Sequence, residues 1–341
     1  MTGKQQPYYY QLIEKSSRYG IPLSVLVELT NRCNLKCSHC YVVKDKGSDE
    51  LTTVEVYRLF DRLADEGCLF LTLSGGEMFL REDILDIAAY ARTNGFVLTL
   101  FTNGTLINEY IATRLANLYL EAVELSLYSL DSDLHDTITG VKGSHEATLR
   151  AIHILRNKGV PVTVKSALMK ENIKDYQDII RFAKGLDIKY IFDPFITPRA
   201  DGDIMPISMR LNPDEAACFL KEMDNRGGEY ELADSHELPA LKEEICAMGK
   251  RTCVISPRGD LFPCLLFPES AGNVREKNFR KIWRESPLLN YLRGLTLADL
   301  KDACSTCKKL DYCQRCSPVA LMEDGDLLGP SSWSCNLSEV L

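Results

Sequence analysis

Cys33-Asn-Leu-Lys-Cys37-Ser-His-Cys40 stands just after an apolar run, Leu23 to Leu29, near the start of this 341-residue sequence. Three cysteines on one short loop can close their thiolates around a single soft metal centre. A structural zinc site normally has four Cys or His ligands, and His39 is too close to its cysteine neighbours to supply the fourth easily. The spacing therefore predicts an iron–sulfur cluster that keeps one iron open, at the end of a strand.

The chain around this loop alternates apolar, β-branched runs with amphipathic helix patterns from residue 23 to about 194. Such alternation predicts a parallel sheet with right-handed crossovers, either an open sheet or an incomplete barrel, and we favour a partial (β/α)6 TIM-like barrel. Sites in such folds lie at the C-terminal ends of the strands, where the cysteine loop lies. The predicted strands are 23–29, 69–73, 96–101, 122–127, 160–168 and 188–192, and the predicted helices are 52–66, 81–93, 109–118, 144–157 and 173–184.

The composition is that of a globular protein, with 45% hydrophobic and 26% charged residues. A formal net charge of −8 argues mildly against a nucleic-acid or anionic-membrane surface. No apolar run approaches the ~18 residues of a membrane span, and the polar start of the chain is no signal peptide. We therefore expect a cytoplasmic protein, in which 13 cysteines indicate metal ligation rather than disulfides.

Eight of the cysteines lie between residues 246 and 335, enough for two complete four-cysteine clusters. Two zinc ribbons are the alternative. Cys68 and Cys218 stand apart, and we predict that both are buried small hydrophobes. The predicted domains are an N-terminal extension at 1–22, the barrel at 23–205, a linker with a bridging helix at 206–245 and a cysteine-rich domain at 246–341.

Polar residues follow the later strands as well. Ser74-Gly75-Gly76-Glu77 comes directly after the second strand, where adjacent glycines let backbone approach a ligand and a carboxylate can bind an ammonium group. A plain tight turn explains this short motif equally well. Asn103 follows the third strand and Ser126 ends the fourth, with a strand-end cap as the alternative for Ser126.

The cysteine loop and the GGE motif together resemble the radical S-adenosylmethionine (radical SAM) superfamily, whose cysteine motif is C-x3-C-x-aromatic-C. The resemblance implies that Cys33, Cys37 and Cys40 hold a four-iron four-sulfur cluster whose open iron binds the amino and carboxylate groups of S-adenosylmethionine. Thr139 stands where the family often has the Arg that binds this carboxylate, which leaves that role unassigned, with Lys142 or Lys165 as replacements. The cofactor-binding residues implied are His39, Gly75, Gly76, Glu77, Asn103 and Ser126.

The C-terminal cysteines resemble the SPASM domain, a two-cluster extension of some radical SAM enzymes. Residues 258–264 read as a hairpin that delivers one ligand, and residues 272–283 resemble the spacer of that domain. Spacing alone would place the four cysteines between 304 and 316 in one cluster. The resemblance instead implies two auxiliary four-iron four-sulfur clusters, one held by Cys246, Cys253, Cys264 and Cys316 and the other by Cys304, Cys307, Cys313 and Cys335.

The resemblance implies that S-adenosylmethionine is cleaved reductively to a 5′-deoxyadenosyl radical, which abstracts hydrogen from a substrate. Oxidative modification of a ribosomally made precursor peptide is our first hypothesis, because residues 140–144 and 325–330 resemble that branch most. Leu265 stands where the sulfatase-activating branch typically has an acidic residue, which ranks that branch lower. A tetrapyrrole side-chain decarboxylase is the alternative, and a multi-cluster electron carrier without a substrate is the non-enzymatic one.

The partners expected are a precursor peptide and an external electron donor such as flavodoxin or ferredoxin, with no nucleic acid and no membrane. The barrel begins at about residue 23, which leaves no room for a fused leader-recognition domain. We therefore expect a separate small leader-peptide-recognition protein.

Overall fold

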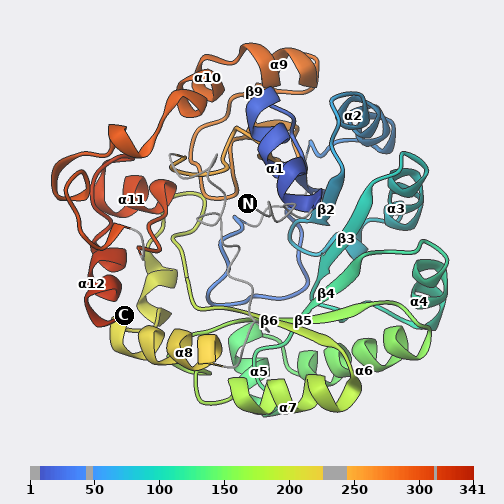
Figure 1. Ribbon diagram of the computed structural model, residues 1–341. Coiled ribbons are helices and arrows are strands. Elements are labelled where there is room, and N and C mark those ends of the chain that lie inside the picture. The colour runs from blue at the N-terminus through green and yellow to red at the C-terminus, as the bar shows by residue number, and fades with distance from the viewer. Residues whose placement is uncertain (1–7, 44–48, 226–243, 311–312) are drawn as a thin grey trace, which may run out of the picture.

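The computed structural model describes residues 8–43, 49–225, 244–310 and 313–341, in which one curved sheet runs in the order β6-β5-β4-β3-β2-β1-β7-β8-β9 (Figure 1). The first six strands pair in parallel in sequence order, as successive strand–helix–strand units do. β6 and β9 are the two edges, so the sheet is open and the expected partial barrel is confirmed. The six are β1 Ser24–Glu28, β2 Phe70–Ser74, β3 Val97–Thr102, β4 Ala122–Ser126, β5 Val162–Ala167 and β6 Lys189–Asp193.

Helices lie around the outside of the strands (Figure 1). The five predicted barrel helices are present, and an additional helix, α5, follows β4. α2 begins at a capping box in which the Thr52 hydroxyl and the Glu55 carboxylate satisfy each other's backbone N–H groups. The helices of this half are α2 Thr53–Asp65, α3 Ile84–Thr93, α4 Glu109–Ala116, α5 Ser132–Thr139, α6 Ser144–Asn157, α7 Tyr176–Leu186 and α8 Pro213–Asn225, with short 3-10 turns at Met78–Leu80 and Met205–Met209.

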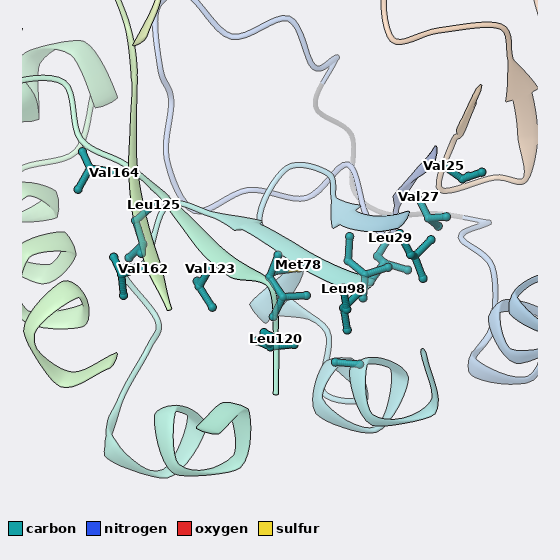
Figure 2. Close-up of a cluster of buried hydrophobic side chains, with 14 of the residues drawn as sticks. Val25, Val27, Leu29, Met78, Leu98, Leu120, Val123, Leu125, Val162 and Val164 are labelled. Atoms are coloured by element: carbon teal, nitrogen blue, oxygen red, sulfur yellow. The ribbon is translucent and has the colours of Figure 1, made fainter. Parts of the chain in front are cut away.

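Buried and half-buried side chains alternate along the barrel strands. In β1, Val25 and Val27 are fully buried, whereas Leu26 and Glu28 are half-buried. Figure 2 shows members of the buried set packed between the strands and the surrounding helices. Each such aliphatic side chain contributes about 1.5–3 kcal/mol by leaving water. The alternate set, which includes Glu28, faces the inside of the curved sheet.

The N-terminal segment forms a helix that the sequence did not predict. Residues 1–22 were expected to be an N-terminal extension, with no helix predicted there, and α1 spans Tyr8–Tyr19. Its Tyr9 ring packs edge-on against Phe70 at the start of β2, with ring centres 6.5 Å apart. The Trp283 indole then donates to the Gly20 carbonyl at 2.6 Å. α1 therefore lies at the end of the barrel opposite the cysteine loop.

The cysteine-rich region continues the barrel sheet. β7 pairs in parallel with β1, and β7 and β8 form the hairpin expected at residues 258–264. The predicted boundary at residue 246 therefore separates segments of one sheet. The elements of this region are β7 Thr252–Ile255, β8 Asp260–Phe262, β9 Gly272–Asn273, α9 Phe279–Glu285, α10 Pro287–Gly294, α11 Ser317–Asp324 and α12 Ser332–Val340, with 3-10 turns at Leu297–Asp299 and Asp302–Cys304.

A buried ion pair attaches the barrel to the cysteine-rich region. Arg210, before α8, donates to both carboxylate oxygens of Glu323 in α11, at 2.5 and 3.0 Å. Its Nε also donates to the Ile196 carbonyl at 2.7 Å. The side chains are only 7% and 13% exposed, so the charges are shielded from water and depend on each other.

The predicted linker is described only in part. The Asn212 side chain accepts from the Glu215 N–H at 2.9 Å, which caps the start of α8, the bridging helix of the predicted linker. The polar part of the linker, 226–243, lies outside the described residues. Among the helices that are described, none has both the length and the apolarity needed to cross a membrane.

Candidate functional site: the cysteine loop and the pocket beside it

The end of α5 holds the cysteine loop. The Lys36 N–H donates to the Thr139 carbonyl at 2.8 Å, and the Ser38 N–H donates to the Ile138 carbonyl at 3.0 Å. Carbonyls at the end of a helix lack partners within the helix, so the loop satisfies groups that α5 leaves free. Thr139, where the family often has Arg, is 1% exposed and has this supporting role in the structure.

Gly75 and Gly76 pack against the segment that enters the cysteine loop. The Gly76 N–H donates to the Thr30 carbonyl at 2.7 Å, and the Glu77 N–H donates to the Arg32 carbonyl at 2.8 Å. A Cβ atom on Gly75 would collide with the Thr30 carbonyl oxygen, and one on Gly76 with the Arg32 carbonyl oxygen. The two glycines therefore allow close backbone contact with the loop itself.

The Glu77 carboxylate joins the ends of β2 and β3. It is 1% exposed and accepts from the Thr102 hydroxyl at 2.8 and 2.9 Å, from the Asn103 N–H at 2.8 Å and from the Phe79 N–H at 3.1 Å. Burial raises the pKa of Glu77, and these hydrogen bonds oppose the shift. The Asn103 amide donates to Asn34 in the cysteine loop at 2.9 Å. Contact of Glu77 and Asn103 with S-adenosylmethionine stays a prediction.

Tyr128, which the sequence did not single out, lies near the three thiols of the loop. Burial raises the pKa of its phenol well above the usual range, the thiols of Cys37, Cys40 and Cys33 raise it further, and a hydrogen bond with Ser126 lowers it. The His39 ring packs edge-on against Tyr128 with ring centres 4.7 Å apart. The structure therefore places Ser126 beside the cysteine loop, and His39 of that loop packs against the same Tyr128 ring. Tyr128 follows Ser126 by two residues at the end of the same strand, and this position is the sequence signal that could have identified it.

Charged groups line the inner face of β4 and β5. Lys165 Nζ lies 3.3 Å from the Glu124 carboxylate and 4.0 Å from the centre of the Phe101 ring. Desolvation raises the pKa of Asp193, an exposed residue at the end of β6, while the hydrogen bond from the Phe195 N–H and the nearby Lys165 charge lower it. Lys165 therefore has carboxylate partners on this face.

The donor set of the loop fits a multi-iron cluster better than a single ion. Three thiols from one loop are the soft ligands that such clusters use, and each binds a different iron. Over the ranges that the structure describes, no three His, Cys, Asp or Glu side chains gather closely enough for one metal ion. The loop residues that would hold the cluster are Cys33, Cys37 and Cys40.

One group of four thiols in the cysteine-rich region lies close together. Burial raises the pKa of the Cys335 thiol, and the nearby thiols of Cys313, Cys304 and Cys307 raise it further. Cys335 comes from α12, Cys304 ends the 3-10 turn at Asp302–Cys304, and Cys307 and Cys313 lie outside the helices and strands. The structure thus brings together the four cysteines predicted for the second auxiliary site.

The first predicted auxiliary set is only partly assembled. Burial raises the pKa of Cys264 to about 12, and the thiols of Cys246 and Cys316 contribute to the shift. Cys253, the fourth expected member, is 2% exposed in the barrel core, and the thiol that contributes to its raised pKa is Cys68. The structure does not bring Cys253 to this group.

The two isolated cysteines, Cys68 and Cys218, differ in their exposure to solvent. Cys68 is buried as predicted, but Cys218 is exposed, so that prediction was wrong. Cys218 lies on α8 among Ala216, Ala217, Phe219 and Leu220, all of which are buried, and its own side chain falls on the outer face of the helix.

A pocket of about 210 Å³ lies between the cysteine loop and the cysteine-rich region. Its polar end holds Glu28, from the end of β1, which accepts from the Tyr41 hydroxyl at 3.0 Å. Burial raises the pKa of Glu28 to about 7, and the Tyr41 hydrogen bond opposes this shift. The rest of the lining includes Cys264 and apolar side chains such as Val42, Leu265 and Phe267. Glu28 could have been singled out as a carboxylate within an apolar run.

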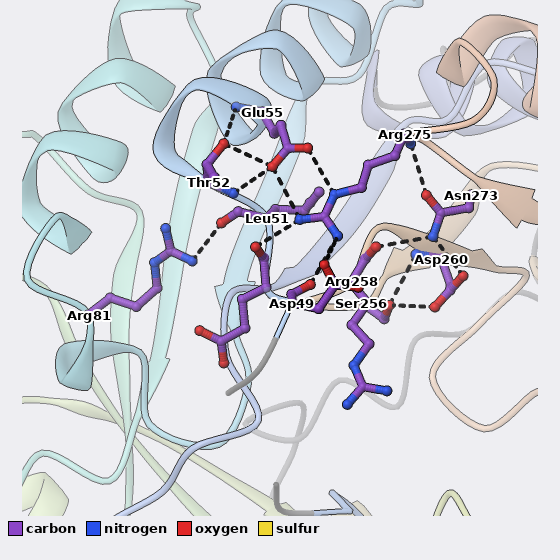
Figure 3. Close-up of polar contacts among 11 residues, drawn as sticks. Asp49, Leu51, Thr52, Glu55, Arg81, Ser256, Arg258, Asp260, Asn273 and Arg275 are labelled. Carbon is purple, nitrogen blue, oxygen red and sulfur yellow. Dashed lines mark hydrogen bonds and ion pairs between the residues drawn. The ribbon is translucent and has the colours of Figure 1, made fainter. Parts of the chain in front are cut away.

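Arg275 fixes the cysteine-rich region beside this pocket (Figure 3). Its guanidinium donates to the Glu55 carboxylate at 2.8 and 3.2 Å and to the carbonyls of Asp49 and Glu50 at 3.0 and 2.8 Å. The Glu50 carboxylate in turn accepts from the Thr30 hydroxyl at 2.5 Å, at the entry to the cysteine loop. This contact gives a structural reason for Arg275 in the spacer at residues 272–283.

Two family models match the chain. The model of the radical SAM superfamily matches residues 27–183, and the model of the SPASM iron–sulfur cluster-binding domain matches residues 246–317. The chain is a radical SAM protein with a SPASM domain. The matches cover the barrel strands β2 to β5, the cysteine loop and both groups of thiols up to Cys316. The family therefore implies iron–sulfur clusters and S-adenosylmethionine for this enzyme.

Curated relatives of this radical SAM protein align along most of its length. An AdoMet-dependent heme synthase from Methanosarcina barkeri is 29% identical over 332 residues, covering 90% of this chain and 94% of the relative. A PqqA peptide cyclase from Bradyrhizobium diazoefficiens is 29% identical over 348 residues, covering 94% and 88%. Among solved structures, SuiB of Streptococcus suis bound to precursor peptide SuiA has a TM-score of 0.75 at 18% identity, covering 98% of this chain and 82% of SuiB. At that identity the likeness shows a shared fold.

Proposed function

We propose that this enzyme oxidatively modifies a ribosomally made precursor peptide by radical chemistry. The observation that carries the proposal is the pocket beside the cysteine loop, because its lining joins Asn31 and Tyr41, which flank that loop, to Cys264 of the cysteine-rich region. Its lining is mainly apolar with a carboxylate and a phenol at one end, which suits a peptide side chain of mixed character.

The proposed cofactors are three four-iron four-sulfur clusters and S-adenosylmethionine. When bound at the loop, the first cluster and S-adenosylmethionine supply a 5′-deoxyadenosyl radical that abstracts hydrogen from the substrate. The chain's own residues hold the cysteine loop in position. α5 and Gly76 form backbone hydrogen bonds with the loop and the segment that enters it, while Glu77 and Asn103 connect the strand ends to the loop by hydrogen bonds.

The peptide hypothesis is supported by the PqqA peptide cyclase, whose similarity covers 94% of this chain. The heme synthase from Methanosarcina barkeri favours the second candidate, a tetrapyrrole side-chain decarboxylase, at the same identity. The two candidates differ in what the pocket must admit. A tetrapyrrole needs a wide site with basic groups for its propionates, whereas the described pocket is about 210 Å³ and carries Glu28 at its polar end.

The proposed partners are a precursor peptide, a separate small leader-recognition protein and an external donor such as flavodoxin or ferredoxin. The donor would deliver one electron for each cleavage. The proposed domains remain those expected from the sequence, with the SPASM domain from residue 246.

The proposed function is tested by anaerobic incubation of the reconstituted enzyme with S-adenosylmethionine, dithionite and peptides encoded by short reading frames beside its gene. We expect 5′-deoxyadenosine and a product peptide whose mass has decreased. Coproheme-type tetrapyrroles form the parallel arm. Loss of carbon dioxide from a tetrapyrrole, with every peptide unchanged, would replace the first proposal by the second.

A further inference from the structure

Glu28 is a carboxylate of the pocket that has no cationic partner. It ends β1 on the inner face of the sheet, and its Oε1 accepts from the Tyr41 hydroxyl at 3.0 Å. Across the part of the chain that the structure describes, no Lys or Arg side chain forms an ion pair with it. On the same face of the sheet, by contrast, Glu124 pairs with Lys165 at 3.3 Å. Glu28 therefore has a single neutral donor where its neighbour on the sheet has a cation.

The pocket around Glu28 has the size of one side chain. Its volume of about 210 Å³ is smaller than the roughly 300–1,000 Å³ of sites that hold a whole small-molecule ligand. Among the described residues that line it, Glu28 is the only charged one. The apolar walls, which come from the segment after Cys40, the β7–β8 hairpin with the residues that follow it, and α11, include Val42, Val254, Phe262, Leu266, Phe267 and Met322.

The chemistry of this lining selects among possible occupants. A carboxylate in apolar surroundings is unfavourable unless it is paired, and burial accordingly raises the pKa of Glu28 to about 7. An acidic group in the pocket would add a like charge, and a purely apolar group would remove the remaining water from the carboxylate without replacing it. An apolar stem that ends in a cation satisfies both the walls and Glu28.

We propose that the pocket is a specificity site for a lysine side chain of the precursor peptide, with the stem against the apolar walls and the ammonium on Glu28. The inference rests on the proposed function, in which the pocket holds a peptide side chain. An ammonium is a compact charge that one carboxylate oxygen can satisfy, whereas a guanidinium pairs best with two. Because Tyr41 already donates to Oε1, lysine is favoured over arginine. Tyr41 directly follows Cys40, so a lysine bound here fixes the peptide beside the cysteine loop.

The site is tested with N-acetyl-lysine N-methylamide and its uncharged match, N-acetyl-norleucine N-methylamide. Saturation-transfer NMR measures both dissociation constants on the reconstituted enzyme, with excess S-adenosylmethionine and no reductant. We expect the lysine probe to bind roughly tenfold to a hundredfold more tightly, the contribution of a charge-assisted hydrogen bond, and more tightly than N-acetyl-arginine N-methylamide. In Glu28→Gln the lysine preference should shrink to within about twofold. Glu82→Gln, at an exposed position, is the control and should keep it.

Tyr41→Phe separates the charge of Glu28 from its hydrogen bond. This variant loses the phenol donor but keeps the carboxylate, so the lysine preference should remain. Thermal unfolding verifies that both pocket variants are folded.

Three results would overturn the inference. The first is a lysine probe that binds wild type no more tightly than the norleucine or the arginine probe, or not at all. The second is the same lysine preference in Glu28→Gln. The third is displacement of the lysine probe by S-adenosylmethionine, because the pocket would then belong to the cofactor.

These binding measurements do not depend on turnover. A modified peptide from an enzyme without lysine preference would overturn the lysine site alone. Lysine preference with every peptide unchanged would support the site and refute the proposed function.

Discussion

The cysteine loop of the barrel and the thiol groups of the SPASM domain are built in different ways. The loop gathers three thiols within one short segment, held by backbone hydrogen bonds from α5 and from the strand end at Gly76. The SPASM groups collect thiols from distant segments, such as Cys246, Cys264 and Cys316. The grouping of the loop thiols is therefore encoded locally, whereas membership in a SPASM thiol group depends on how the sheet is paired.

The largest effect is expected in the loop. Cys37→Ala removes one of three thiolates that have no substitute nearby, so 5′-deoxyadenosine should fall to the background of the assay. The measurement is chromatographic, after anaerobic incubation with S-adenosylmethionine and dithionite. Cys218→Ala is the control, because Cys218 is exposed and belongs to no thiol group. Equal product from wild type and Cys37→Ala would refute the loop as the reactive site.

Gly76→Ala tests whether close backbone contact holds the loop. The new Cβ would collide with the Arg32 carbonyl oxygen, so the loop must move. A displacement near 1 Å lowers 5′-deoxyadenosine formation by roughly tenfold to a hundredfold. Gly185→Ala in α7 is the control, since a Cβ there has no neighbour within 4 Å. If the two variants retain the same activity, the loop does not depend on this contact.

Arg210→Ala tests how strongly the buried ion pair with Glu323 attaches the SPASM domain to the barrel. It leaves the Glu323 carboxylate buried without its partner, so the free energy of unfolding should fall by about 3 kcal/mol. Arg181→Ala removes a pair that is largely exposed and should cost about 0.5 kcal/mol or less. Urea unfolding measures both. A loss no larger than that of the Arg181 control would show that the buried pair does not hold the domains together.

The fourth prediction concerns pH. Folding raises the pKa of Glu28 from 4.5 to about 7, so the folded state keeps this proton after the unfolded chain has lost it, and the free energy of unfolding falls as pH rises from about 4.5 to about 7. Glu28→Gln stays neutral, and above pH 8 it should be more stable than wild type by about 1–3 kcal/mol.

At pH 5.5 wild-type Glu28 is mostly protonated, so the stability gap between wild type and Glu28→Gln should shrink. Thermal unfolding at both pH values measures it. Glu82→Gln, at an exposed position, is the control. A gap that is the same at both pH values would mean that Glu28 is not the titrating group.

Much of the barrel could be predicted from the sequence, because alternation of strand and helix patterns is local. The loop cysteines were found for the same reason. α5 was missed because its sequence, SDLHDTIT, has only two apolar positions, although its end carbonyls support the loop. Cys253 was misplaced because its environment is set by the register of β7 against β1, a contact between residues far apart in the chain.

The most direct test of the account measures 5′-deoxyadenosine in a variant with Cys264, Cys307 and Cys335 replaced by Ala and the loop intact. Dithionite can reduce the loop cluster directly, so we predict 5′-deoxyadenosine formation within about threefold of wild type while modified peptide disappears. Electron paramagnetic resonance confirms that the loop cluster is present. A fall to the background of Cys37→Ala, with that cluster still present, would contradict the account and make the SPASM domain the route by which electrons reach the loop.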